Sequence, residues 1–405
     1  MSFLQSRLLN NRSLLAMLSS RVMSVLSYQM ITVAVGWQAY AITQSTFFLG
    51  LIGLFQFIPM FIFTIPAGHA ADIYDRRKIS ALCQAIQAAV VIALAALSAA
   101  GTVNRATLLA LVFILGTARA FENPSLQALL PQLVDKKDFP EAVAWGASTF
   151  SAAAILGPAA GGFLYALKPF AVYGASGVLL AAAAAFMMAV SHVHKAGKRE
   201  PVSLKSLFAG IHFIRTRPVI LGSVSLDLFA VLLGGATALL PVYAQNILHT
   251  GPAGLGILRS APSAGALIIS LILAGRPIKR KMGRTMFAAV SVFGLATVIF
   301  GVSTNFWLSL AMLVLLGAAD VFSVVIRSSL VQIGTPDAMR GRVSAVNMMF
   351  IGTSNQLGEF ESGITAAWFG TVPAVVIGGL GTLVVVALWM WMFPRLLHAD
   401  KPVKQ

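Results

Sequence analysis

The chain has 405 residues, of which 58% are hydrophobic and only 10% are charged. Soluble globular domains carry about 25% charged residues, so this composition excludes an ordinary soluble protein and indicates a membrane protein. The net charge of +16 does not indicate nucleic-acid binding, because the basic residues lie in short segments between apolar runs. The single cysteine, Cys83, excludes an intramolecular disulfide and a multi-cysteine metal site.

Long apolar segments account for most of the chain, and a membrane-spanning helix needs about 20 such residues. In chain order the twelve segments are 14–42, 47–71, 79–100, 106–128, 142–167, 170–191, 219–246, 253–274, 286–303, 306–327, 343–368 and 373–393. A β-barrel would instead show alternation over about ten residues. We read no removable signal peptide, since no small-residue cleavage site follows a short apolar core. The sequence therefore predicts an all-α membrane protein with twelve transmembrane helices.

Lysine and arginine are distributed unequally between the predicted loops. With the N-terminus inside, the external loops hold only Arg105 and Lys168. Cytosolic loops are rich in basic residues, so both termini are expected in the cytosol and the chain in the inner (plasma) membrane. A polar connection, 192–218, separates six spans in 1–191 from six in 219–405. Its part "SLKSLFAGIHFI" is either an amphipathic helix on the inner membrane surface or a solvated linker.

The second half of the chain repeats features of the first half 200 positions later. Arg76 aligns with Arg276 and Gln132 with Gln332, and the order of spans and loops matches as well. Two six-helix halves related in this way are an architecture of secondary transporters, which bind substrate near the middle of the membrane.

Several motifs resemble one transporter family over essentially the whole chain. "GHAADIYDRRK" (68–78) resembles the signature between the second and third helices of the major facilitator superfamily, and "LGPAAGGF" (156–163) resembles the antiporter motif of its exporters. Four further stretches resemble the branch that contains the enterobactin exporter and macrolide efflux proteins: "GWQAYAITQS", "TARAFENPSLQALLPQLV", "TPDAMRGRVSAVN" and "NQLGEFESG". The resemblance implies the major facilitator fold, no cofactor and a monomer.

The charged loop of 68–78 is expected to act as a latch on the cytosolic side. Gly68 would let two helices approach closely, and Asp72 would face a helix N-terminus of the opposite half. By resemblance, Arg76 would pair with an acid near the inner end of the fourth span, for which Glu122 is the candidate. Alternatively, the basic residues only keep the loop inside. Asp75 stands where the family usually has glycine.

Ionisable residues inside spans are costly and are therefore functional candidates. Glu359 and Glu361 in the eleventh span lie about 200° apart around a helix, so only one can face a central cavity. A buried carboxylic acid can take up and release a proton as its hydration changes, which proton-coupled transport requires. Alternatively, either glutamate is permanently hydrogen-bonded to neighbours such as Asn355 or Gln356.

Two further intramembrane residues are candidates for proton coupling. Asp227 is either a second proton site or the partner of a basic residue such as Arg21. Arg119 shares a helix face with Glu122, three residues later. In related exporters an arginine in this helix is tied to proton coupling; the alternative is an ion pair with Glu122.

Other charged residues in the spans are harder to assign. Asp320 and Arg327 share one face of the tenth span, and we interpret them as helix-packing charges rather than substrate contacts. Arg259 either attracts an anionic substrate or extends outward to the membrane surface.

The fifth span contains the run "GPAAGG", formed by Gly157, Pro158, Gly161 and Gly162. Proline and glycine permit a bend and close packing, which could seal the cavity of an exporter or be ordinary packing between helices. Side chains of the first two spans that could line a cavity, or that anchor helices instead, are Tyr28, Gln29, Trp37, Gln38, Tyr40, Gln56 and Phe57.

Together these features predict a proton-coupled exporter of a small amphipathic molecule, a siderophore or a hydrophobic drug. An importer or uniporter is the main alternative. A receptor would need larger external segments than the short loops found here. The sequence has no phosphate-binding glycine loop, nucleophile arrangement or paired metal ligands that would favour an enzyme.

Overall fold

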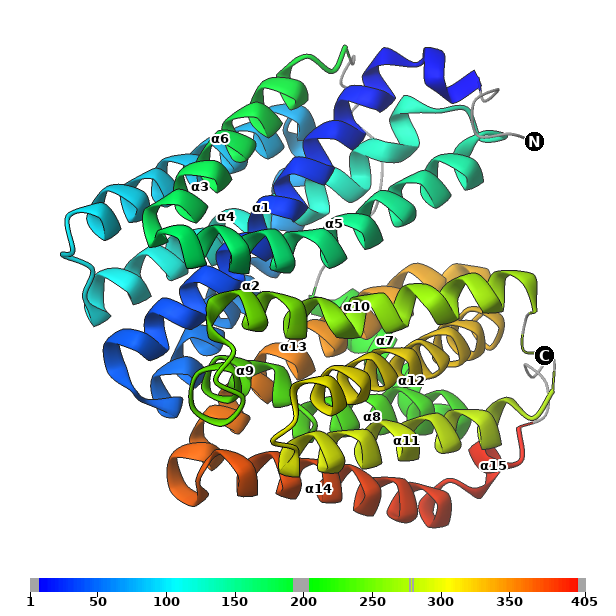
Figure 1. The fold of residues 1–405 in the computed structure, drawn as a ribbon. Coiled ribbons are helices and arrows are strands. Elements are labelled where there is room, and N and C mark those ends of the chain that lie inside the picture. Colours follow the sequence, from blue (N-terminus) through cyan, green and yellow to red (C-terminus); the bar gives the residue numbers. More distant parts are fainter. Residues whose placement is uncertain (1–6, 192–203, 277, 279, 400–405) are drawn as a thin grey trace. The chain divides into compact units, whose positions relative to one another are not determined.

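The structure is a computed structural model that describes residues 7–191, 204–276, 278 and 280–399. Within these ranges the chain is helical, with no strand, which confirms the all-α prediction (Figure 1). The first part of the predicted connection at 192–218 falls outside the described residues. Its second part forms helix α7 (Leu204–Thr216).

The helices that precede this connection correspond to the first six predicted spans. They are α1 (Arg12–Thr43), α2 (Thr46–Ile73), α3 (Arg76–Ala99), α4 (Arg105–Leu133), α5 (Phe139–Leu167) and α6 (Pro169–Met188), after a short turn η2 (Arg7–Asn10). Those that follow α7 are α8 (Pro218–Leu233), α10 (Gly251–Gly275), α11 (Met282–Val302), α12 (Phe306–Ile333), α13 (Asp337–Phe369), α14 (Thr371–Met392) and α15 (Pro394–Leu397).

Among the described residues, 11 helical segments are long and apolar enough to cross a membrane. The predicted span at 343–368 lies in α13, which is not among them although it has 33 residues. Its polar side chains, including Asn355, Glu359 and Glu361, lower its mean hydropathy. The least apolar of the predicted spans is therefore a helix of sufficient length whose composition alone does not mark it as a membrane span.

The seventh predicted span, 219–246, is not one continuous helix. After α8 the chain continues through η3 (Ala236–Leu239), α9 (Leu240–Val242) and η4 (Tyr243–Ile247), a π-helical turn. The break falls at Gly234 and Gly235, and a Cβ on Gly235 would lie 2.6 Å from the carbonyl oxygen of Gly358 in α13. Discontinuous helices in transporters commonly lie at binding sites, so this break is of functional interest.

The described helices group into two compact units. The N-terminal unit comprises 1–43, 55–201 and 251–260, and the C-terminal unit comprises 44–54, 202–250 and 261–405. In the N-terminal unit α1 packs against α5 and α6, and α3 packs against α4 and α6 (Figure 1). A core of Leu14, Met17, Leu129 and other apolar side chains fills this unit.

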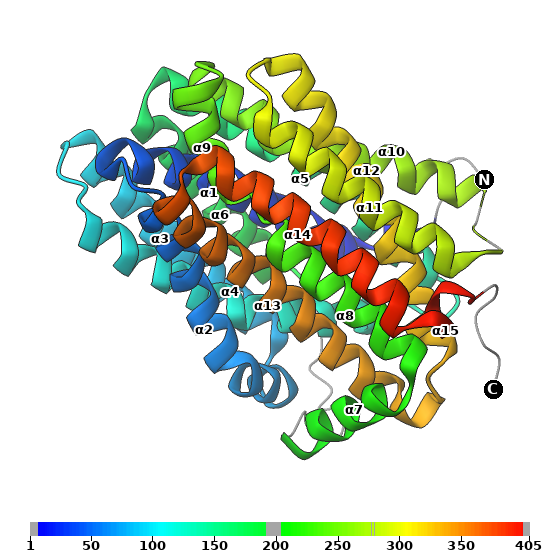
Figure 2. The same cartoon turned by 90° about the horizontal axis from the view of Figure 1, so that it is seen from below.

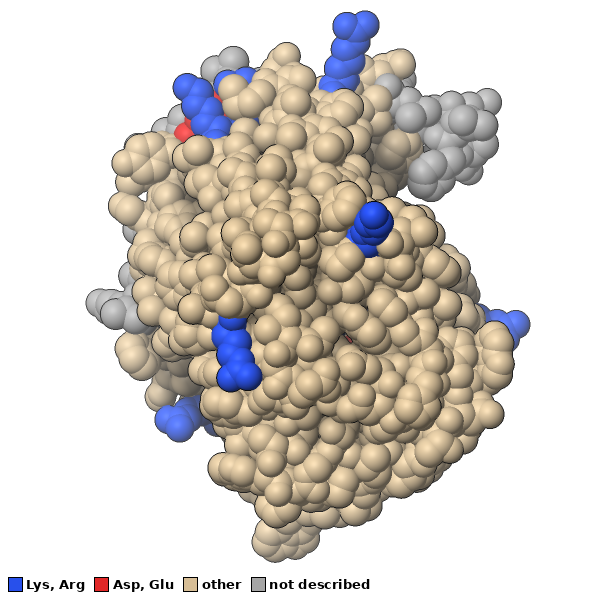
Figure 3. All heavy atoms as spheres, turned by 60° about the vertical axis from the view of Figure 1, so that its left-hand side comes forward, with Lys and Arg blue, Asp and Glu red and all other residues tan. Residues whose placement is uncertain are grey.

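In the C-terminal unit α8, α13 and α14 lie side by side, and α11 packs against α12 and α14 (Figure 2). Helix α7 contacts α13, where a Cβ on Gly210 would lie 2.9 Å from the carbonyl oxygen of Arg342. Large apolar side chains such as Trp307, Trp368 and Trp391 are exposed on their helices. On the face drawn in Figure 3, uncharged residues form most of the surface and a few Lys and Arg side chains stand apart.

Candidate functional site

The C-terminal unit contains a partly open cavity of about 350 Å³. Its walls come from α8, the broken segment after α8, α10, α11, α12 and α13. The lining includes four ionisable residues among apolar and small polar ones: Asp227, Asp320, Arg327 and Glu359, with Val231, Gly234, Gly235, Thr237, Pro262, Ser263, Ala266, Phe293, Leu316, Gly317, Val324, Ile351, Ser354 and Asn355. We call this the C-terminal cavity.

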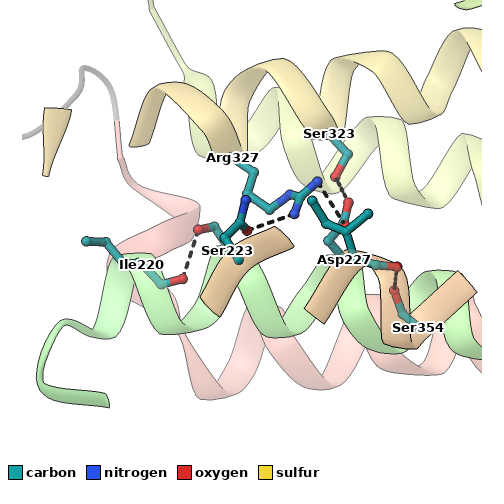
Figure 4. A network of polar contacts seen from close by, with 8 residues as sticks. Ile220, Ser223, Asp227, Ser323, Arg327 and Ser354 are labelled. Atoms are coloured by element: carbon teal, nitrogen blue, oxygen red, sulfur yellow. Dashed lines mark hydrogen bonds and ion pairs between the residues drawn. The ribbon is translucent and has the colours of Figure 1, made fainter. Parts of the chain in front are cut away.

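A buried ion pair lies in the wall of the C-terminal cavity (Figure 4). An Nη2 atom of Arg327 lies 3.3 Å from Oδ2 of Asp227, and the two side chains are 2% and 6% exposed. Ser323 donates a hydrogen bond to Asp227 (2.9 Å), and Arg327 donates one to Asn347 (2.9 Å). The basic partner of Asp227 is therefore Arg327, and the predicted pairing with Arg21 is wrong.

The C-terminal cavity also separates the two glutamates of α13. Glu359 lines the cavity, whereas Glu361 accepts a hydrogen bond from the hydroxyl of Thr365 (2.8 Å). This agrees with the expected angle between them, which allows only one to face the cavity. Asp320 and Arg327 line the cavity too, so their interpretation as packing charges alone was incomplete.

In the N-terminal unit, Glu122 is the most deeply buried acid of the predicted site. It is 1% exposed and accepts hydrogen bonds from Ser24 (2.7 Å), Gln84 (3.0 Å) and Gln87 (2.7 Å). These three donors satisfy both carboxylate oxygens. Glu122 is thus held by neutral donors of α1 and α3.

The predicted pairing of Arg76 with Glu122 is wrong. Arg76 instead lies 3.9 Å from Asp72, one turn earlier in the chain. Glu122 lies too far along the helix axis from Arg76 to pair with it. It contacts Gln84, which follows Arg76 by eight positions, or about 12 Å along a helix. Gly68 is not at a close helix contact either, because a Cβ there would meet no described atom within 4 Å.

The unexpected acid of the loop, Asp75, has a local structural role. It is the N-cap of α3, and its carboxylate accepts a hydrogen bond from the backbone N–H of Arg77 (3.0 Å). It also lies 3.3 Å from the Arg77 guanidinium. The same guanidinium donates to the carbonyl oxygen of Val190 after α6 (2.8 Å), so the loop is fixed to its own unit.

Replacement of Asp75 by alanine is expected to lower the free energy of unfolding by about 1 kcal/mol, because the first turn of α3 loses its cap. Thermal unfolding of the detergent-solubilised protein measures this change. Asp75→Asn should retain most of the stability, since an amide oxygen also caps a helix. Asp135→Ala is the control, because Asp135 is 80% exposed and 4.0 Å from its partner Lys137. If Asp75→Ala lowers the free energy of unfolding no more than Asp135→Ala does, the capping role is contradicted.

Arg119 does not form the alternative ion pair with Glu122. Its guanidinium carbon lies 3.6 Å from the centroid of the Tyr28 ring. Tyr28, Arg119, Thr32, Gln56 and Gln87 line a small recess of about 20 Å³ within the N-terminal unit, together with Ile31, Val35, Val112, Leu115 and Gly116. We call this the N-terminal recess.

The other predicted cavity residues lie in helix contacts or on partly exposed positions. Gln38 is buried and accepts a hydrogen bond from Tyr173 (2.6 Å), so it joins α1 to α6 and is no cavity contact. Gln29 packs beside Gly157, and Phe57 packs on Phe61. The remaining side chains of this set are distributed as follows: Trp37 and Arg259 are partly exposed, and Tyr40 is buried.

The run "GPAAGG" packs against two helices at once. A Cβ on Gly161 would lie 2.7 Å from the Cα of Met30 in α1. On the other side, a Cβ on Gly162 would lie 2.9 Å from the Cα of Gly256 in α10. Ser260 of α10 also donates a hydrogen bond to the carbonyl oxygen of Ile155 (2.7 Å). The glycines are therefore required by close backbone approach.

Sequence reasoning missed part of the C-terminal network. The roles of Ser323 and Asn347 were not predicted, although Ser323 precedes Arg327 by one turn on the same helix face. The break at Gly234 and Gly235 was also missed. The adjacent glycines within an apolar run were the available signal, since glycine weakens a helix.

Residues 9–402 match the family model described as transmembrane secretion effector. The enterobactin exporter EntS of Citrobacter koseri is 26% identical over 397 residues, which cover 96% of this chain and 93% of that protein. EntS of Escherichia coli K12 is 26% identical over 393 residues, covering 95% and 92%.

Solved structures with the same fold are transporters. A bacterial homolog of the human lysosomal transporter Spinster, inward-facing and occupied, superposes with a TM-score of 0.74 at 13% identity, covering 95% of this chain and 96% of that one. The nucleoside transporter NupG gives a TM-score of 0.69 at 17% identity, covering 94% and 99%. These likenesses confirm the predicted fold class of two six-helix halves.

Proposed function

Because the chain belongs to the transmembrane secretion effector family, within the major facilitator superfamily, we propose that it exports a small amphipathic molecule in exchange for protons. Family membership makes the chain a multi-pass membrane transporter of a small molecule, not an enzyme. Direction, coupling ion and substrate are the proposed parts. The observation that carries them is the acidic C-terminal cavity.

The C-terminal cavity has the size and chemistry of a small-molecule site. Ligand pockets typically measure about 300–1,000 Å³ and combine apolar walls with a few polar groups. Here Phe293 and Leu316 supply apolar surface, and Ser263 supplies a hydroxyl group. Such a lining suits a molecule with one apolar and one polar face.

Proton exchange is assigned to Glu359 and Asp320. Asp227 pairs with the Arg327 guanidinium and accepts a hydrogen bond from the Ser323 hydroxyl, so we assign it a structural role rather than proton exchange. Glu359 and Asp320 face the same cavity and would gain protons when it opens to the outside and lose them when it opens to the cytosol. Asp227 then acts as a fixed structural charge.

The curated relatives are named enterobactin exporters, so a siderophore is the first substrate to test and a hydrophobic drug is the second. The basic residues in the loops favour the inner membrane with both termini in the cytosol. In this proposal the protein works as a monomer by alternating access. Asp72 and Arg76 strengthen the closed state of the cytosolic side. The run Gly157–Gly162 limits leakage of substrate.

Inverted membrane vesicles with an acidic interior test the proposal. A siderophore or drug added outside should accumulate inside, and a protonophore should abolish the accumulation. Glu359→Gln and Asp320→Asn should remove proton-driven accumulation while leaving exchange of labelled for unlabelled substrate. Glu361→Gln is the matched control on the same helix, since Glu361 is bonded to Thr365 and does not line the cavity.

Two outcomes would contradict the proposal. Accumulation that persists when the proton gradient is collapsed would exclude proton coupling. Equal loss in Glu361→Gln and Glu359→Gln would mean that both act through the stability of α13 and not through the cavity.

A further inference from the structure

The N-terminal recess contains the guanidinium of Arg119, which forms no ion pair with an acid among the described residues. Arg119 stacks on the Tyr28 ring at 3.6 Å, an arrangement that stabilises the charge without using its N–H groups. The acid one turn away, Glu122, already accepts three hydrogen bonds from Ser24, Gln84 and Gln87. Arg119 is therefore held by a ring and not by a carboxylate.

One N–H group of Arg119 lacks an acceptor. Its Nη1 atom is buried and has no hydrogen-bond partner within the described part of the chain. A buried donor left unpaired costs about 1–3 kcal/mol, and more when it is charged. Such a cost is unusual in a native protein, so an acceptor from outside the chain is the natural complement to this atom.

The neighbouring polar groups of the recess add a further donor beside the guanidinium. The Tyr28 hydroxyl donates to Oε1 of Gln56 (3.1 Å), and the NH₂ group of the same amide is a further donor. The Thr32 hydroxyl donates to the backbone oxygen of Tyr28 (2.7 Å). Gln87 donates to Glu122. A guanidinium and an amide NH₂ together suit a group that accepts hydrogen bonds, and most strongly an anion.

We propose that the N-terminal recess binds an oxygen anion of the transported molecule, a carboxylate or phenolate, through Arg119 and Gln56. The recess measures about 20 Å³, enough for one functional group and not for a whole substrate. The ring of Tyr28 fixes the plane of the guanidinium and, through its hydroxyl, the orientation of Gln56. The inference deepens the proposed transport function by naming a substrate feature, and it rests on that function only for the source of the anion.

Thermal unfolding of the purified full chain in detergent tests the proposal, with three probes of one shape and different charge. Benzoate, benzyl alcohol and benzylamine are compared at equal concentration and ionic strength in chloride-free buffer. Benzoate should raise Tm by roughly 2 °C more than the other two, because a ligand that binds only the folded state stabilises it. Sodium chloride in a fourth arm tests a free inorganic anion.

Variants assign the effect to the recess. Arg119→Gln should abolish the benzoate-specific shift. Gln56→Leu should reduce the benzoate-specific shift while Arg119 stays stacked on Tyr28. This second variant tests the proposal if the Arg119→Gln protein does not fold. Arg105→Gln is the control: Arg105 is exposed at the start of the same helix, and its loss should leave the shift unchanged.

Three results would overturn the proposal. They are an equal shift with benzyl alcohol, a benzoate shift that survives Arg119→Gln, or a shift of the same size with chloride, which would assign the recess to an inorganic anion. Since no proton gradient is present in detergent, these results are independent of the vesicle assay. Failure of one therefore does not imply failure of the other.

Discussion

Replacing Arg327 by methionine is expected to destabilise the protein by roughly 3–5 kcal/mol, the cost of leaving one member of a buried ion pair alone. Asp227 is only 6% exposed and would keep the Ser323 hydrogen bond but no cation. Asn347 would also lose its donor. An unpaired buried charge is one of the few mechanisms by which a single substitution has so large an effect.

A double variant that removes both charges tests whether the unpaired Asp227 causes this loss of stability. Asp227→Leu combined with Arg327→Met removes both charges, and apolar replacements of a buried pair are often neutral for stability. The double variant should therefore be more stable than the single variant Arg327→Met. The measurement is the fraction of protein that remains monodisperse after heating in detergent. Equal loss in both would show that Asp227 is not stranded by the single change.

The double variant also separates folding from transport. If the ion pair serves only to join α8 and α12, a stable double variant should transport normally in the vesicle assay. The proposed function predicts otherwise, because the fixed charges of Asp227 and Arg327 set the electrostatic environment of Asp320 in the same cavity. We expect folded protein with little proton-driven accumulation.

The helices could be predicted from sequence because bilayer thickness sets a minimum apolar length, and apolar content can be summed along the chain. Helix α13, which contains the predicted span 343–368, is long enough to cross a membrane but has a lower apolar content than the other spans, and it carries Asn355 and Glu359 into the C-terminal cavity. The residues that make a transport site are the ones that weaken the membrane signal.

The sequence also identifies charged residues within the predicted spans, but it does not identify their partners. The cost of a charge within the membrane makes Glu122, Arg119 and Asp227 candidates for a functional role. Partner choice depends on helix rotation and depth, which a single sequence does not give. Arg119 and Glu122 share a helix face, yet the arginine stacks on Tyr28 and the glutamate accepts hydrogen bonds from neutral side chains.

A similar limit applies to Glu359 and Glu361. Helical geometry requires that they point in different directions, but the choice between them depends on how α13 packs against its neighbours. A Cβ on Gly53 would lie 3.0 Å from the Cβ of Glu359, so this side of α13 is also in close contact with the start of α2. Only the packed structure assigns Glu359 to the cavity.

The second large effect is expected at the crossing of α5 and α10, where Gly162→Leu should separate two helices. A Cβ at this position would lie 2.9 Å from both the Cα and the N of Gly256, and backbone atoms cannot turn away as a side chain can. Overpacking typically costs about 1–3 kcal/mol, and more where backbone must shift. Lower Tm in detergent and faster passive leakage of substrate from vesicles are the expected results.

Matched glycines test whether this crossing is the cause. Gly174→Leu in α6 is the control, because a Cβ there meets no described atom within 4 Å, and it should leave Tm and leakage nearly unchanged. Gly256→Leu should reproduce the defect from the other helix, since its Cβ would lie 3.0 Å from the Cα of Gly162. A Gly162→Leu protein as stable and as tight as Gly174→Leu would mean that the two backbones are not in contact. Loss of stability without leakage would instead assign the "GPAAGG" run to helix packing and remove it from the seal of the cavity.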